Sequence, residues 1–110
     1  MRPILVAITL LLSTLTSPLL AADLTSEQSA QARQLFTALG CQACHDFNKS
    51  GSTLAPSLDR IGLKLNAEQI LARLQLPAQK LGQGEKFMPS YRTTAPAQLE
   101  LLSRFLAQRK

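Results

Sequence analysis

The sequence predicts a small all-α domain with three main helices and long loops. The chain has 110 residues, which is enough for one small domain. Three segments place apolar residues at helical spacing, and none shows the strict alternation of a half-buried strand. The intervening residues 46–57 and 77–91 are rich in Gly, Pro, Ser and Asn, which predicts two loops. Loops of this length in a compact domain are usually functional.

The first helix is predicted over residues 26–39. Thr25 and Gln28 have the spacing of a capping box, and Gly40 stands where a helix would end. The apolar residues fall at i, i+3, i+4 and i+7, which makes one helix face of Ala32, Leu35, Phe36 and Leu39.

Two further helices are predicted over residues 67–76 and 96–107. The second begins with Asn66 and Gln69 at cap spacing and ends before Pro77. The third has Thr94 near its cap and a proline in its first turn, and its apolar face consists of Leu99, Leu102, Phe105 and Leu106. A short helical turn is also expected near residues 58–61.

Residues 1–22 have the composition of a secretory signal peptide. A positive charge at Arg2 precedes an apolar run over residues 4–12, then Pro18 and two small residues that end at Ala22. The run is shorter than the roughly 20 residues that a membrane span needs. We therefore expect cleavage near Ala22 and a periplasmic protein, with a retained membrane anchor as the alternative. Loss of Arg2 would leave residues 23–110 with 11 basic and 7 acidic residues, a net charge of +4.

The stretch "GCQACH" at residues 40–45 contains the only two cysteines and the only histidine of the chain. A thioredoxin-like redox pair is disfavoured, because the motif follows a predicted helix and no βαβ pattern is present. Structural zinc needs four ligands and blue copper needs two histidines, and the chain supplies neither set. A disulfide between Cys41 and Cys44 would close a very small ring, stabilise little, and leave His45 without a role.

The favoured interpretation is covalent attachment of a c-type haem, one per chain. Thiols three positions apart suit the two vinyl groups on one edge of a porphyrin, and His45 follows as an iron ligand. The second axial ligand is then expected to be Met88, since Met1 belongs to the signal segment. Methionine is a common partner of histidine in such proteins, and Met88 lies in a loop beside Pro89 rather than on a helix face.

The order of the predicted helices, the cysteine motif and the methionine loop along the chain resembles that of a class I cytochrome c, a small monohaem electron carrier. The resemblance covers almost all of residues 23–110, from "LF" and "GCQACH" through "LAPSL" and "MPSY" to "LLSRFLAQ". The four-helix c-prime cytochromes carry the motif near the C-terminus instead. The resemblance implies that the Pro56 carbonyl accepts a hydrogen bond from Nδ1–H of His45, although Ala55 replaces the family's usual glycine. It also implies that the first and last helices cross, with Phe36 against Leu102 and Phe105 and with the small Ala32 at the crossing.

The expected function is one-electron transfer, without catalysis, because both axial positions are filled. An apolar shell is expected from Leu54, Leu58, Ile61, Leu65, Leu74 and Phe87, and propionate contacts from Tyr91 and Arg92. Lys49, Lys80 and Lys86 are expected to help the protein meet an acidic redox partner in the periplasm or membrane; no nucleic-acid partner is expected. The alternatives are a cytochrome subunit of a periplasmic oxidoreductase, for example one that oxidises sulfur compounds, and a sensor or peroxidase with a labile Met88.

Overall fold

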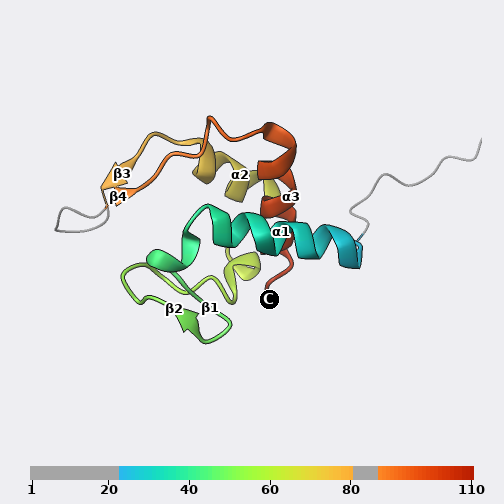
Figure 1. Cartoon of the computed structure of the whole chain (residues 1–110). Helices are drawn as coiled ribbons and strands as arrows, with labels where there is room; N and C mark the ends of the chain where they lie inside the picture. The colour runs from blue at the N-terminus through green and yellow to red at the C-terminus, as the bar shows by residue number, and fades with distance from the viewer. Residues whose placement is uncertain (1–22, 81–86) are drawn as a thin grey trace, which may run out of the picture.

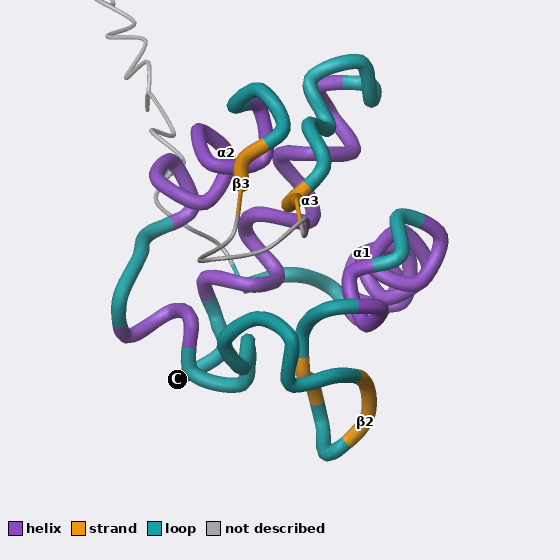
Figure 2. The backbone as a smooth tube through the Cα atoms, turned by 90° about the vertical axis from the view of Figure 1, so that its left-hand side faces the viewer, coloured by secondary structure: helices purple, strands orange, loops and turns teal. Residues whose placement is uncertain are grey.

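The fold is built on three α-helices, α1 (Ser26–Ala38), α2 (Ala67–Gln75) and α3 (Pro96–Ala107). The structure, a computed structural model, describes residues 23–80 and 87–110. Figure 1 shows α1 running across α3, and in Figure 2 α1 is seen nearly end-on beside the other two helices. The three predicted helices are therefore confirmed, two of them one residue shorter at the C-terminal end. The predicted signal peptide lies outside the described residues.

Capping explains where the first two helices begin. Thr25 Oγ1 accepts a hydrogen bond from the Gln28 N–H at 3.1 Å, and the Gln28 side chain accepts one from the Thr25 N–H at 2.9 Å. Asn66 and Gln69 form the same reciprocal pair at the start of α2, with both distances 2.9 Å. These boxes satisfy backbone donors that the first helical turn leaves without a partner.

The start of α3 agrees with the prediction in Pro96, whereas Thr94 lies next to the cap and is not the cap itself. Its N-cap is Ala95, which makes no side-chain capping hydrogen bond, and Pro96 occupies the first turn. The N–H of Thr94 donates to the Tyr91 carbonyl at 2.8 Å, so Thr94 belongs to the preceding turn. Proline has no N–H to satisfy and a backbone angle that suits a helix, which lets α3 begin without a polar cap.

Two short antiparallel hairpins occupy the segments predicted as loops. The first pairs β1 (Asp46–Phe47) with β2 (Ser50–Gly51), and the second pairs β3 (Gln79–Lys80) with β4 (Phe87–Met88). Figure 1 shows β3 and β4 side by side. Each strand has two residues, which is too short to show the alternation that would have predicted it.

Two 3₁₀ turns complete the described structure, η1 (Cys41–Ala43) and η2 (Ile61–Leu63). The helical turn expected near residues 58–61 is therefore displaced toward the C-terminus. In residues 23–80 and 87–110, no helix combines the length and apolar character that a membrane crossing requires.

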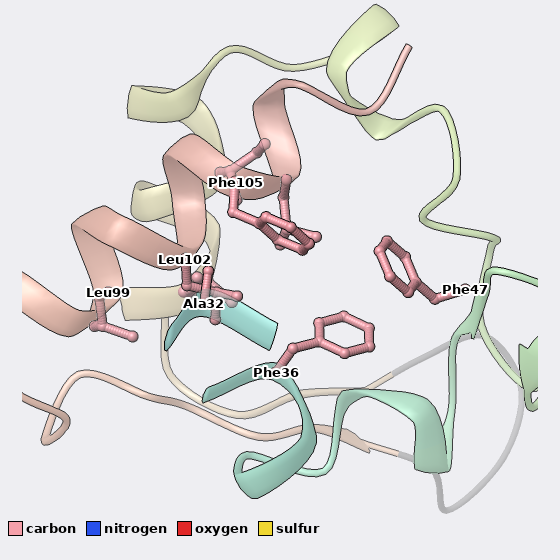
Figure 3. Packing of buried hydrophobic residues seen from close by; sticks show 9 residues of the cluster. Ala32, Phe36, Phe47, Leu99, Leu102 and Phe105 are labelled. Carbon is pink, nitrogen blue, oxygen red and sulfur yellow. The ribbon is translucent and has the colours of Figure 1, made fainter. Parts of the chain in front are cut away.

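The core lies where α1 crosses α3. Ala32 and Leu102 are fully buried there, and Phe36 and Phe105 are 3% and 4% exposed. This is the crossing that the family resemblance implied. Figure 3 shows a third ring, Phe47, that faces both phenylalanines; the Phe36 and Phe47 centroids are 4.7 Å apart, and those of Phe47 and Phe105 are 6.0 Å apart. The core thus reaches the segment that directly follows the cysteine motif.

Candidate functional site

The cysteine motif is presented by the C-terminal end of α1. The helix is followed by Gly40 at a φ of 74°, a left-handed conformation that glycine adopts without steric cost. The chain then turns through η1, where the N–H groups of Cys44 and His45 both donate to the Cys41 carbonyl, at 3.3 and 3.0 Å. This tight turn brings the three motif residues to one wall of a cavity.

His45 is held by the backbone of the loop that follows. Its Nδ1 lies 2.6 Å from the Pro56 carbonyl oxygen, which can only accept, so the ring donates through Nδ1–H. The tautomer that results carries its lone pair on Nε2. A hydrogen bond of this kind orients an imidazole that binds a metal through its other nitrogen. The contact that the resemblance implied is present, although Ala55 replaces glycine.

Met88 reaches the same cavity from a distant part of the chain. It lies in β4, opposite Gln79 of β3, and it lines the cavity together with His45. The hairpin places Met88 at its base, where strand pairing restrains the backbone. The two residues predicted as axial ligands therefore share one cavity.

The cavity has a volume of about 430 Å³ and a mainly apolar lining. Four members of the predicted apolar shell line it, namely Leu58, Ile61, Leu65 and Leu74. Leu54 does not, and its side chain is 50% exposed; that prediction was wrong, because the loop carries Leu54 away from the cavity. The side chain of Phe87 lies outside the described part of the structure.

The polar edge of the cavity differs from the prediction. Its cations are Lys64 and Arg73, whereas Arg92 is exposed and absent from the lining. Tyr91 lines the cavity, but its hydroxyl donates to the Leu39 carbonyl at 3.0 Å. The Tyr91 donor is thus already engaged in tying the Met88 segment to the end of α1. Sequence reasoning missed Lys64 and Arg73, because only the fold brings η2 and α2 to this edge.

The predicted docking lysines are only partly described. Lys49 is exposed in the turn between β1 and β2 and does not line the cavity. The side chain of Lys80 and all of Lys86 lie outside the described residues.

Burial raises the pKa of two groups on the cavity wall, Cys41 and Tyr91. It raises the pKa of the Cys41 thiol to about 11, against a smaller lowering by a backbone hydrogen bond. It also raises the pKa of Tyr91, with further increases from the charges of the Cys41 and Cys44 thiolates. No disulfide joins the two cysteines, and no three His, Cys, Asp or Glu side chains converge in the described ranges 23–80 and 87–110.

Comparison with known families identifies the family to which the chain belongs. The family model described as "Cytochrome c" matches residues 29–110, which is most of the chain. The chain belongs to the cytochrome c family. No curated protein and no solved structure matches it.

Cytochromes c bind haem c covalently and transfer electrons, and the residues of this cytochrome c suit that group. The cavity wall carries two thiols in the attachment spacing and a histidine whose Nδ1 is already hydrogen-bonded. Met88, which carries a thioether, lines the same space, and the rest of the lining is mainly apolar, with two cations at its edge. This combination of soft and nitrogen ligands with an apolar enclosure fits a haem better than a bare metal ion.

Proposed function

We propose that this cytochrome c is a periplasmic one-electron carrier with one haem per chain. Cys41 and Cys44 would form the thioether bonds, and His45 and Met88 would bind the iron. The observation that carries the proposal is the shared cavity, in which a histidine with its Nδ1 committed to Pro56 and the only methionine of residues 23–110 line the same space.

A c-type haem supplies a one-electron Fe(III)/Fe(II) couple. The residues around the haem would set the potential of this couple. The Pro56 carbonyl orients His45 and increases its basicity, which favours the oxidised state, whereas a methionine ligand and the apolar lining favour the reduced state. Lys64 and Arg73 stand at the cavity edge, where they would pair with the propionates.

The carrier role follows from this ligand set. With protein side chains at both axial positions, a substrate would find no open site on the iron. Export follows from residues 1–22, and it agrees with the assembly of c-type haem outside the cytoplasm. The net charge of +4 expected for residues 23–110 would favour encounter with a redox protein that has an acidic docking surface.

The test is an optical spectrum of the exported, haem-loaded protein, oxidised and reduced, with and without carbon monoxide. We expect a low-spin spectrum that carbon monoxide does not change. Met88→Ala should become sensitive to carbon monoxide, whereas the matched control Leu63→Ala, at a 63% exposed position outside the cavity lining, should not. Rapid carbon monoxide binding by the wild-type protein would contradict the His/Met proposal, and absence of covalent haem would contradict it entirely.

A size measurement on the native protein distinguishes a free carrier from a subunit of an oxidoreductase. The exposed large apolar side chains of the described residues, Leu54, Leu63 and Leu76, come from three different segments. Scattered single leucines are ordinary on a protein surface. We therefore expect a monomer, and a stable complex with a second chain would favour the subunit function.

A further inference from the structure

A ladder of hydrogen bonds holds the segment after Cys44 against the segment after Leu54. The Ala55 N–H donates to the Cys44 carbonyl at 2.8 Å, and the Leu58 N–H donates to the Asp46 carbonyl at 2.9 Å. The contact between His45 and Pro56 lies between these two bonds. At the far end, the Asn48 N–H donates to Oδ1 of Asp59 at 2.8 Å. The position of the Pro56 carbonyl relative to the imidazole is therefore set by the ladder as a whole.

The far end of the ladder is a strained turn. Asn48 and Lys49 connect β1 to β2 and both have positive φ, 50° and 62°. Two such residues are needed for the tight hairpin turn, but a lysine there has a steric cost that glycine would avoid. Contacts from outside the hairpin, beginning with the one between Asn48 and Asp59, offset part of this cost.

Arg109 supplies further contacts of this kind from the other end of the chain. Its guanidinium carbon lies 4.6 Å from the centroid of the Phe47 ring, which is 5% exposed, and its Nη2 donates to Oδ1 of Asn48. Its carbonyl accepts from the Gly62 N–H at 2.8 Å, just beyond the second segment of the ladder. The backbone of Arg109 is in turn anchored to α3, because its N–H donates to the Leu106 carbonyl at 3.0 Å.

The approach at Gly62 requires a residue without a side chain. A Cβ there would lie 2.1 Å from the Ala107 carbonyl oxygen and 2.7 Å from that of Arg109, distances that real Cβ atoms do not reach. The end of α3 is therefore fitted closely to η2. A single residue, Arg109, touches the hairpin turn through its side chain and η2 through its backbone.

We propose that Arg109 is a positioning residue for the His45 ligand: it stabilises the Asn48 end of the ladder and thereby keeps the Pro56 carbonyl hydrogen-bonded to Nδ1–H of His45. The inference rests on the proposed function, because only a His45 that binds iron would transmit this geometry to a reduction potential. Loosening the ladder weakens the hydrogen bond, makes the imidazole a poorer donor, and so raises the potential. Loss of a positive charge alone would lower it.

The experiment compares Arg109→Gln with Lys110→Gln in the haem-loaded protein. Lys110 is exposed and adjacent, so the two variants lose the same charge at the same end of the chain. The first readout is hydrogen exchange of the His45 Nδ1–H, followed by NMR in the reduced, diamagnetic state. We expect exchange about two- to five-fold faster in Arg109→Gln, the factor expected from loss of a cation–π contact, and no change in Lys110→Gln. The second readout is the midpoint potential, which should be higher in Arg109→Gln than in Lys110→Gln.

A double-mutant cycle tests the route through the turn. Asn48→Gly removes the hydrogen-bond acceptor of the Arg109 side chain without adding strain at a positive φ. Its effect on exchange should be clearly smaller in the Arg109→Gln background than in the wild type, and strictly additive effects would overturn the proposed route. Equal exchange and equal potential in Arg109→Gln and Lys110→Gln would overturn the positioning role. A wild-type protein without covalent haem, or one that binds carbon monoxide rapidly, would instead contradict the proposed function itself.

Discussion

The Nδ1 atom of His45 and the carbonyl oxygen of Pro56 lie 2.6 Å apart, although eleven positions separate the two residues. The acceptor belongs to the backbone, so its position depends on the path of the loop rather than on the identity of a side chain. The ladder that fixes this path has bonds on both sides of the contact. The His45 environment is therefore a property of two segments held together.

Pro56→Ala should leave the carbonyl acceptor in place and cost little. Proline restricts the unfolded chain, so its replacement should lower the free energy of unfolding by about 0.5–1 kcal/mol. Chemical denaturation of the haem-loaded protein measures this change. Pro77→Ala, an exposed proline outside the cavity, should cost a similar amount. If Pro56→Ala failed to retain low-spin haem, the proline ring of Pro56, and not only its carbonyl, would be required to position His45.

Tyr91→Phe should loosen the segment that carries Met88. The substitution keeps the aromatic ring on the cavity wall and removes only the hydroxyl that donates to Leu39. We expect a loss of about 1 kcal/mol in the free energy of unfolding, the net value of a typical hydrogen bond. A stability equal to that of the wild type would show that water replaces the hydroxyl without cost.

Alkaline pH should destabilise the protein through the same residue. Burial, and then the charges of Cys41 and Cys44, raise the pKa of Tyr91 above its ordinary value of 10.0. Thioether bonds would remove the cysteine charges and leave the effect of burial. Because the folded pKa is raised, the stabilisation is complete below about pH 10 and is lost as the pH rises through the folded pKa.

Ultraviolet titration can follow Tyr91 without interference from other tyrosines, since the chain has one. Its midpoint should lie above 10 in the folded, haem-loaded protein, and unfolding in denaturant should return it to about 10. Tyr91→Phe should lack this contribution to the alkaline loss of stability. A folded midpoint at or below 10 would contradict the burial argument.

The parts of this molecule that the sequence predicts well are those encoded locally. Capping boxes mark the starts of α1 and α2 within four residues, and the two thiols and the imidazole of the site are neighbours in the chain. Met88 was predicted because residues 23–110 offer no second histidine and no other methionine. In each case a short segment or a simple count carried the information.

The missed parts depend on pairs far apart in the sequence. The contact of Tyr91 with Leu39 spans 52 positions, and that of Arg109 with Asn48 spans 61. Phe47 stands alone in a polar segment, so no periodicity marks it as a core residue. Leu54 shows the converse error, because an apolar residue in a predicted loop was assigned to the shell and proved half-exposed.

Leu102→Ala should be the costly substitution in the helix crossing. Leu102 is fully buried against α1, so truncation leaves a cavity that the close approach at Ala32 prevents from collapsing. We expect a loss of about 2–5 kcal/mol in the free energy of unfolding, measured by denaturation of the haem-loaded protein. The control Leu63→Ala should cost well under 1 kcal/mol, because that side chain is 63% exposed. Similar losses in the two variants would argue against the crossing as the centre of the core.

Arg73→Gln tests whether a cation at the cavity edge raises the midpoint potential of the haem. Arg73 lies on α2 at the cavity edge, whereas Arg60 is exposed and does not line the cavity. A cation near the iron favours the reduced state, and pairing with a propionate would strengthen that effect by keeping the cation close. We therefore expect Arg73→Gln to lower the midpoint potential at low ionic strength, and Arg60→Gln to lower it much less.

The difference between the two variants should shrink as salt is added, because Arg73 is solvent-exposed and its field is screened within about 10 Å at 0.1 M salt. Equal shifts in the two variants would mean that Arg73 acts only through the net charge of the protein, and that the propionates are held by Lys64 or by solvent.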